Sequence, residues 1–278
     1  MLILWVMACA SVPATQEAGD ISVLTYNVHG LPSAITGDDT LARMAQIGPL
    51  LDTYDLVAIQ EDFMDDGHAL IDEGTDLPFK TRFSELVNPE RVYGSGLSTF
   101  GIHPVLEEQG QHFSACHGVI DNASDCLATK GFQVITLELD PGLPLYLVNT
   151  HLEAGGGQED QVARESNVDE LIETMSGLDL DSPLIFLGDT NLHPEDTVDG
   201  MLSARFETEL GLEDVCSILD CPEPNRIDRI YVRDGAMATL VPENWKVAEE
   251  MVDNNGVDLS DHNGIVAEIQ WARTGQSD

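Results

Sequence analysis

The chain has 278 residues, of which 42% are hydrophobic, a proportion that is ordinary for a globular protein and excludes global disorder. Fifty acidic residues against twelve basic ones give a formal net charge of −38. Such a surface repels polyanions, and no basic stripe that would follow a nucleic-acid backbone is evident. Adaptation to salty surroundings explains this charge, and so does the attraction of cations.

The first eleven residues form a short apolar run that ends in small side chains. The run is too short to cross a bilayer and is typical of the end of a signal-peptide hydrophobic region. Residues 6–9 resemble a bacterial lipoprotein cleavage box, in which Cys9 becomes the lipidated first residue; an ordinary signal remnant is the alternative. We therefore expect a secreted protein, or one anchored to the cell envelope through Cys9. Residues 1–19 would be remnant and linker, residues 20–272 a single domain and residues 273–278 a tail.

Strands and helices mix along the rest of the chain. Apolar or alternating runs predict strands at residues 21–26, 56–59, 132–139, 145–149, 184–187, 227–232 and 265–271. Apolar residues at near-helical spacing predict helices over residues 41–51 and 168–175, and a Pro-Gly turn at residues 140–144 predicts a hairpin. This pattern predicts one mixed α/β domain with two packed sheets and outer helices.

Four cysteines follow the N-terminal region in two close pairs, Cys116 with Cys126 and Cys216 with Cys221. Four cysteines allow three connectivities, and the two local pairs close the smallest loops. Together with an export-like N-terminus, this favours disulfides over reduced thiols. Each short loop would stabilise the fold by about 2–3 kcal/mol.

Polar residues stand at the ends of most predicted strands. They are Asn27, Glu61, His151, Asp189, Asn191, Asp228, Asp261 and His262. If outgoing and returning strands share one edge of the sheets, these side chains meet at one rim. Most of them offer carboxylate or amide oxygens, which favour Mg²⁺ or Mn²⁺ over zinc.

The same rim has the residue types that hydrolysis of a phosphodiester requires. His262 can accept the proton of an attacking water near neutral pH. Asp228 can fix the tautomer of that histidine and stabilise the imidazolium. His151 and Asn191 can donate hydrogen bonds to the charge that develops on the phosphoryl oxygens.

Six motifs in order carry a resemblance to a known superfamily. They are Tyr26-Asn27-Val28, Gln60-Glu61, Thr150-His151-Leu152, Gly188-Asp189-Thr190-Asn191, Ile227-Asp228-Arg229-Ile230 and Ser260-Asp261-His262. Together they resemble the endonuclease/exonuclease/phosphatase superfamily, which includes pancreatic-type deoxyribonucleases and neutral sphingomyelinases. The motifs span residues 26 to 262, which is nearly the whole expected domain.

The resemblance implies a four-layer α/β sandwich of two mixed sheets flanked by helices. It also implies a metal on Glu61, with Asp261 in or beside the metal shell, and a pairing of Asp228 with His262. The resemblance further assigns phosphate contacts to three residues and gives Asp189 a role in assisting the nucleophile or the leaving group. These three residues are Asn27, His151 and Asn191. Asn27 also belongs to the set that we expect around the metal, and Arg164 matches an arginine that members often have.

The substrate is a separate question from the superfamily. Lys130-Gly131-Phe132 looks like the entry to the central strand of neutral sphingomyelinases, and residues 27–32 are similar to that branch. The acidic surface also agrees better with a zwitterionic choline lipid than with DNA. We therefore expect a Mg²⁺-dependent phosphodiesterase that acts on a phospholipid head group, as a monomer.

Two other functions remain open from the sequence. An extracellular nuclease of the deoxyribonuclease type would use Arg226, Arg229 and Arg233 as a basic patch for nucleic acid. A catalytically inactive binding module on the bacterial surface is the second alternative. The presence of all the predicted catalytic residues argues against the inactive module.

Overall fold

Two six-stranded β-sheets form the centre of the protein in a computed structural model, which describes residues 17–86, 91–118, 126–223 and 226–275. The first sheet contains, in spatial order, β11 (Ala238–Val247), β12 (Ile265–Arg273), β1 (Ala18–Asn27), β2 (Leu56–Gln60), β4 (Leu97–Gly101) and β3 (Phe79–Phe83). The second contains β5 (Val105–His112), β6 (Gly131–Asp140), β7 (Leu143–His151), β8 (Leu184–Asp189), β10 (Asp228–Arg233) and β9 (Glu213–Asp214). Both sheets are mixed, because β1 pairs with β2 and β7 with β8 in parallel, and the other pairs are antiparallel.

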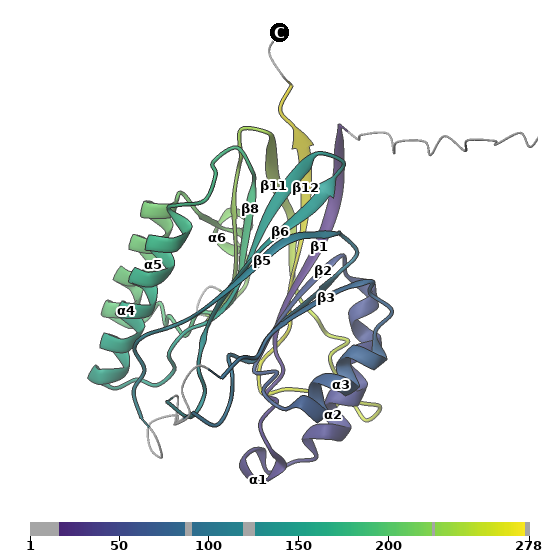
Figure 1. The fold of residues 1–278 in the computed structure, drawn as a ribbon, viewed down its shortest axis with the longest axis vertical. Coiled ribbons are helices and arrows are strands. Elements are labelled where there is room, and N and C mark those ends of the chain that lie inside the picture. The colour runs from purple at the N-terminus through teal and green to yellow at the C-terminus, as the bar shows by residue number, and fades with distance from the viewer. Residues whose placement is uncertain (1–16, 87–90, 119–125, 224–225, 276–278) are drawn as a thin grey trace, which may run out of the picture.

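Helices cover the outer face of each sheet (Figure 1). α1 (Ser33–Thr36), α2 (Thr40–Ile47), the 3₁₀ helix η1 (Gly48–Thr53) and α3 (Asp65–Gly74) lie on the side of the first sheet. α4 (Gln158–Met175) and α5 (Thr197–Leu210) lie outside the second sheet, and α6 (Val215–Leu219) follows β9. Helices, sheet, sheet and helices therefore make the predicted four-layer sandwich.

Three apolar cores hold these layers together. Ala58 and Val23 of the first sheet pack with Leu147 and Ile185 of the second sheet in the core between the sheets. Separate cores join α4 and α5 to the second sheet, and α2, η1 and α3 to the first. The central strands are buried on both faces, which is why they appear in the sequence as continuous apolar runs.

All seven predicted strands are present, with ends that differ by a few residues from the prediction. The hairpin between β6 and β7 is also confirmed, since Asp140 pairs with Leu143. The helix expected over residues 41–51 is divided into α2 and η1, with Pro49 at the start of η1. Proline lacks the N–H that a continuing α-helix needs, so the chain changes its helical type there.

Both predicted local disulfides, Cys116–Cys126 and Cys216–Cys221, are present. Cys9 and its lipoprotein cleavage box lie outside the described residues. Within the described part of the chain, no helix has the length and apolar character needed to cross a membrane.

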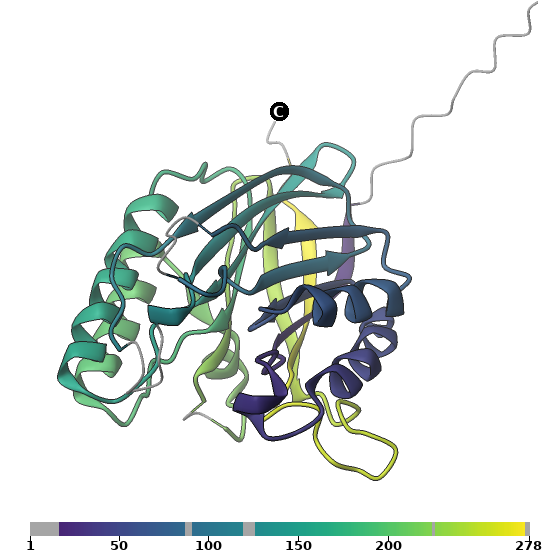
Figure 2. The same cartoon turned by 60° about the horizontal axis from the view of Figure 1, so that its bottom comes forward.

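The register of the strands brings the predicted rim together at one end of the sandwich. Asn27 pairs with Gln60 across β1 and β2, and Asp189 pairs with His151 and Asp228 on the two sides of β8. β12 begins at this same end, three residues after His262. Figure 2 turns this end forward and shows α1 and the segment that leads into β12 beside it.

Candidate active site

Asn27 connects the two sheets at the centre of the rim. Its amide nitrogen Nδ2 donates to Glu61 Oε1 at 2.9 Å and to Asp189 Oδ2 at 3.0 Å. Its amide oxygen Oδ1 accepts from the backbone N–H of His29 at 3.0 Å. One fully buried amide therefore fixes the carboxylate of Glu61, from the first sheet, against that of Asp189, from the second.

The backbone of the rim is strained at three residues that are not glycine. His29, Glu61 and Asn191 have φ values of 48°, 59° and 48°, in the left-handed region that L side chains rarely adopt. The backbone N–H of Gly30 donates to the carbonyl of Glu61 at 3.0 Å, and a Cβ on Gly30 would lie 2.3 Å from that oxygen. Glycine at position 30 thus permits the close contact that holds Glu61 in its unusual conformation.

Gly188, which precedes Asp189, leaves no room for a side chain between β8 and β7. Gly188 has a φ of 145°, and a Cβ there would lie 2.1 Å from the carbonyl oxygen of Thr150. After Asp189 the chain turns sharply, with the backbone N–H of Asn191 donating to Asp189 Oδ1 at 3.1 Å. The side chain of Asn191 donates to the carbonyl of Leu152 at 3.2 Å, next to His151.

His262 pairs with Asp228 as predicted. Its Nδ1 lies 2.8 Å from Asp228 Oδ2, and its Nε2 lies 3.9 Å from Asp189 Oδ2. Burial alone would lower the pKa of the imidazole, but the hydrogen bond and charge of Asp228 and the charge of Asp189 raise it. The three groups offer ligand atoms that all lie within 4.8 Å of one another.

His151 stays neutral at physiological pH. It is buried, its Nε2 lies 3.4 Å from Asp189 Oδ2, and burial together with the charge of Lys130 lowers its pKa to about 3. Lys130 itself is buried beneath the site and donates to the carbonyl of Leu152 at 2.9 Å. The lysine that opens Lys130-Gly131-Phe132 is therefore part of the rim and is not on the open surface.

Glu61 offers a further carboxylate oxygen to a cation, in addition to the cluster of Asp189, Asp228 and His262. Its Oε2 is buried and has no hydrogen-bond partner among the described residues, while Oε1 is held by Asn27. Burial raises its pKa, which means that the ionised form lacks sufficient compensation from the protein alone. An orphaned, oxygen-only ligand in such a position fits Mg²⁺ or Mn²⁺.

The other two expected metal residues are placed differently. Asp261 lies at the exposed edge, with a side chain that is 59% exposed and an Oδ1 that lies 3.5 Å from His29 Nδ1. The amide oxygen of Asn27 already accepts a backbone N–H. Ser260, between these segments, ties them together by donating to the carbonyl of Asn27 at 2.6 Å.

Two arginines, the buried Arg164 and the half-buried Arg43, support the rim, and neither was assigned a role from the sequence. Arg164 in α4 binds both oxygens of Asp199, at 3.0 and 3.1 Å, and donates to the carbonyls of residues 153–155, which follow His151. Its position on the same helix face as Val168 and Leu171 was the signal that it is buried. Arg43 in α2 donates to the carbonyls of Val28 and His29, and so supports the segment after Asn27.

The family model for the endonuclease/exonuclease/phosphatase family matches residues 24–262 of the chain. The chain belongs to this family. The match includes every rim residue described above, from Asn27 to His262.

One curated relative that the chain matches in sequence is a sphingomyelinase of Mycobacterium bovis. It is 26% identical over 278 residues, which cover 93% of this chain and 54% of the relative. The chain thus spans about half the length of the curated relatives it matches.

Solved structures share the fold of this family member at low sequence identity. A beta toxin from Staphylococcus aureus with bound magnesium ions superposes with a TM-score of 0.68 at 16% identity, covering 90% of this chain and 99% of that one. TDP2 of D. rerio in complex with a single-stranded DNA product superposes with a TM-score of 0.69 at 19% identity, covering 90% and 98%.

The structure contradicts the expected basic patch of Arg226, Arg229 and Arg233. Arg226 and Arg229 are only 9% and 4% exposed, and both bind Asp214. Arg233 lies further along β10 and donates to the carbonyl of Leu210. Because their charges are neutralised or buried, these arginines form no surface patch for nucleic acid.

Proposed function

We propose that the chain is a Mg²⁺-dependent phosphodiesterase, with His262 activating the attacking water and a choline phospholipid as its substrate. The observation that carries the hydrolytic part is the arrangement of Asp228, His262 and Asp189. Asp228 holds Nδ1 of His262, so Nε2 is left to face Asp189 and the reacting water. Mn²⁺ would serve in place of Mg²⁺.

The proton transfer follows from this geometry. The raised pKa of about 10 makes His262 a strong base but keeps most of it protonated at neutral pH in the metal-free protein. In its deprotonated form, Nε2 takes a proton from water as the oxygen attacks phosphorus in line with the leaving oxygen. The imidazolium that forms is stabilised by Asp228 and Asp189, whose charges raise the pKa of His262. Asp189 also contacts His151, so it is placed to orient the water or to assist the leaving oxygen.

The phosphoryl group would be held by neutral donors and a cation. His151 is neutral and Asn191 carries an amide, so both offer hydrogen bonds to developing negative charge without repelling a cation. Glu61 would hold the cation, with Asn27 orienting Glu61 and with Asp261 at the edge of the metal shell. When bound, Mg²⁺ neutralises phosphoryl charge and lowers the pKa of a coordinated water.

A cavity lined mostly by residues that follow Glu61 in the sequence supports a choline head group. This cavity, of about 510 Å³, is lined by Phe63, Tyr93, Asp65 and Asp66 among other residues. The two aromatic rings lie 5.6 Å apart, and the backbone N–H of Phe63 donates to the carbonyl of Glu61 at 2.8 Å. Aromatic faces and carboxylates attract quaternary ammonium groups, so the lining of the cavity suits choline.

The names of the relatives agree with this substrate. The matched mycobacterial proteins are sphingomyelinases, although they are about twice as long as the matched region. The DNA-bound structure of TDP2 keeps a nuclease as the second candidate, since it shares the fold. The burial of Arg226 and Arg229 disfavours that candidate, because it removes the expected phosphate-tracking charges.

The test is a parallel turnover assay with Mg²⁺ on sphingomyelin liposomes and on plasmid DNA, with His262→Ala as the control. Release of phosphocholine that is lost in the variant and in EDTA supports the proposal. DNA nicking alone would replace the lipid by nucleic acid. Ligand binding without turnover of either substrate would support an inactive binding module instead.

The choline cavity has its own test. Phe63→Leu keeps apolar volume but removes the aromatic face, so we expect KM for sphingomyelin to rise about fivefold to tenfold. Hydrolysis of bis(p-nitrophenyl) phosphate, which has no ammonium group, should be unaffected. Equal losses on both substrates would show that Phe63 supports Glu61 and not choline.

The two disulfides support an extracellular location, because disulfides persist in oxidising compartments. We propose that the protein is secreted or anchored through a lipidated Cys9, and that it acts as a monomer. Mass spectrometry of the mature N-terminus tests the lipidation, and light scattering tests the oligomeric state. An unmodified N-terminus downstream of Cys9 would exclude the anchor.

A further inference from the structure

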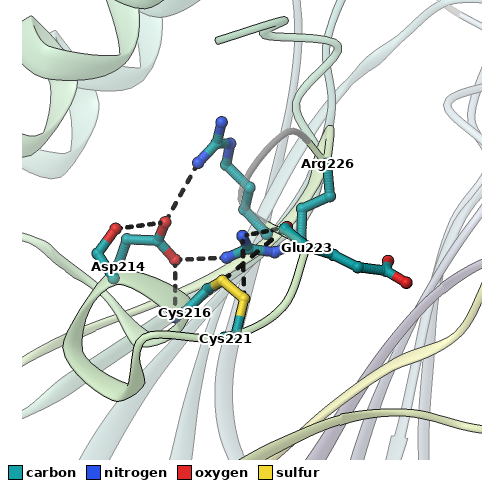
Figure 3. The surroundings of a disulfide bond; sticks show 7 residues. Asp214, Cys216, Cys221, Glu223 and Arg226 are labelled. Carbon is teal, nitrogen blue, oxygen red and sulfur yellow. Dashed lines mark hydrogen bonds and ion pairs between the residues drawn. A yellow bond between two sulfur atoms is a disulfide. The ribbon is translucent and has the colours of Figure 1, made fainter.

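Asp214 neutralises two buried arginines, Arg226 and Arg229, which lie on either side of Asp228 in the sequence. Figure 3 shows Asp214 with Arg226. Its Oδ1 lies 2.6 Å from Arg226 Nη2, and its Oδ2 lies 3.2 Å from Arg229 Nη1. All three side chains are less than a tenth exposed. We call Asp214, Arg226 and Arg229 the Asp214 clamp.

Residues 226–229, the segment that contains both arginines of the clamp, also form hydrogen bonds with the turn that contains Asp189. The carbonyl of Ile227 accepts from the backbone N–H of Thr190 at 3.0 Å and from its hydroxyl at 2.7 Å. Thr190 stands between Asp189 and Asn191 in the sequence. The position of residues 226–229 therefore sets the positions of Asp228 and of the Asp189 turn together.

The Cys216–Cys221 disulfide holds Asp214 from the other side. The backbone N–H of Cys216 donates to Asp214 Oδ1 at 3.1 Å, and the Ser217 hydroxyl donates to Oδ2 at 3.2 Å. Arg226 Nη1 lies 3.8 Å from Cys221 Sγ and 3.2 Å from the carbonyl of Glu223, as Figure 3 shows. The disulfide closes the short loop that supplies Cys216, Ser217 and Cys221 to these contacts.

We propose that Asp214 is a positioning residue for the Asp228–His262 pair, and that the Cys216–Cys221 disulfide keeps it in place. The proposal rests on the proposed hydrolytic function of that pair. Asp214 does not itself contact His262; it acts by fixing the backbone on both sides of Asp228. Without its charge, two buried guanidinium groups lose their counterion and move toward water, and Asp228 moves with them.

The chain offers a matched control for this residue. Asp140 is also buried and binds an arginine, Arg273, at 2.8 Å, but it lies at the end of β6 opposite to the rim. Asp214→Asn and Asp140→Asn therefore make the same chemical change at two buried carboxylates that each bind arginine. If Asp214 only stabilised the fold, the two variants would behave alike in turnover.

We expect Asp214→Asn to lower kcat by about tenfold or more, with KM and the apparent Mg²⁺ affinity changed less than about twofold. Asp140→Asn should lower the melting temperature without changing kcat, and Asp214→Glu should recover part of the lost kcat. Equal kcat values for Asp214→Asn and Asp140→Asn, measured below both melting temperatures, would overturn the proposal.

The disulfide gives a second variant in case Asp214→Asn does not fold. Cys216→Ser combined with Cys221→Ser should lower kcat, whereas Cys116→Ser combined with Cys126→Ser should leave it near the wild-type value. Unchanged kcat in the first double variant would remove the disulfide from the proposal.

A spectroscopic reading separates this proposal from the proposed function. The Nδ1 proton of His262, hydrogen-bonded to Asp228, should give a downfield NMR resonance in the wild-type protein. Asp214→Asn should shift or broaden it, and Asp140→Asn should not. If the wild type turns over neither substrate, the proposed function fails, but this resonance still decides the positioning role of Asp214. An identical resonance in all three proteins would overturn it.

Discussion

Glu61 is a residue whose local energetics oppose folding. Its backbone lies in the left-handed region, its Oε2 is buried without a partner, and burial raises its pKa. When the pKa of a carboxyl is raised in the folded state, the protein loses folding stability as pH rises above the pKa that the carboxyl has in the unfolded chain. The metal-free protein therefore carries a cost at neutral pH that a bound cation would offset.

Glu61→Gln should consequently stabilise the metal-free protein while removing its response to metal. We expect its melting temperature without metal to rise by about 2–5 °C at pH 7, because the variant no longer buries an ionisable carboxyl. Addition of Mg²⁺ should raise the melting temperature of the wild type and not that of the variant. Thermal melts with Mg²⁺ and with EDTA measure both effects, and a variant that is still stabilised by Mg²⁺ would place the metal elsewhere.

Asp228→Asn should lower kcat by about 10²–10⁴-fold, because an amide cannot stabilise the imidazolium of His262 and favours the wrong tautomer. The apparent affinity for Mg²⁺ should stay near the wild-type value, since Glu61 is untouched. Turnover at saturating substrate across a Mg²⁺ titration gives both quantities. Wild-type kcat in this variant would mean that another group orients His262.

Much of the site can be predicted from single residues at strand ends. Asn27, Asp189 and Asp228 follow or begin buried strands, and the polarity of a strand determines the edge at which its terminal side chain lies. Other properties depend on contacts between the two sheets, which no local pattern records. The double hydrogen bond of Asn27 is one, and the burial of Arg226 against Asp214 is another.

At the scale of elements, the strands that the sequence pattern missed are mostly at the edges of the sheets. β3, β5, β9 and β11 are all edge strands, and β5 exposes most of its residues. An edge strand packs on fewer neighbours, so it carries polar residues that weaken its apolar periodicity. The exception is β4, which is wholly buried but contains Ser98, Thr99 and Gly101 in place of large apolar residues.

The start of α5 depends on a single acidic cap. Asp196 Oδ1 accepts the backbone N–H groups of Val198 at 2.8 Å and Asp199 at 3.2 Å. These two hydrogen bonds lower the pKa of Asp196. α5 also carries the Asp199 that binds Arg164, and Arg164 donates to the carbonyls of residues 153–155 after His151.

The cap predicts a pH dependence with a definite sign. A carboxyl with a lowered folded pKa contributes stability that is present above its unfolded pKa and is lost as pH falls through its folded pKa. Asparagine caps helices nearly as well but does not titrate. Asp196→Asn should therefore match the wild type closely at pH 7 and lose less stability between about pH 5 and pH 3. Melting temperatures over this range test the difference, with Asp196→Ala as the control that lacks a cap at every pH.

At the scale of the whole molecule, a net charge of −38 leaves strong repulsion among surface carboxylates. Salt shortens the Debye length from about 10 Å at 0.1 M to about 3 Å at 1 M. The melting temperature should rise by several degrees across this range in NaCl, and equally in KCl if screening is the cause. A flat or falling curve would show that repulsion among the surface carboxylates does not limit the stability of the fold.

The pairing of β1 with β12 brings the two ends of the domain close together, which determines where the chain can be circularly permuted or tethered. Ala18 lies opposite Ala272, and both are at the pole remote from Asn27 and His262. A short linker from Arg273 to Ala18 would therefore make a circular permutant, with new termini placed in an exposed surface loop. Tethered to a bead or a fusion partner through this pole, the enzyme would present its rim outward to an incoming vesicle.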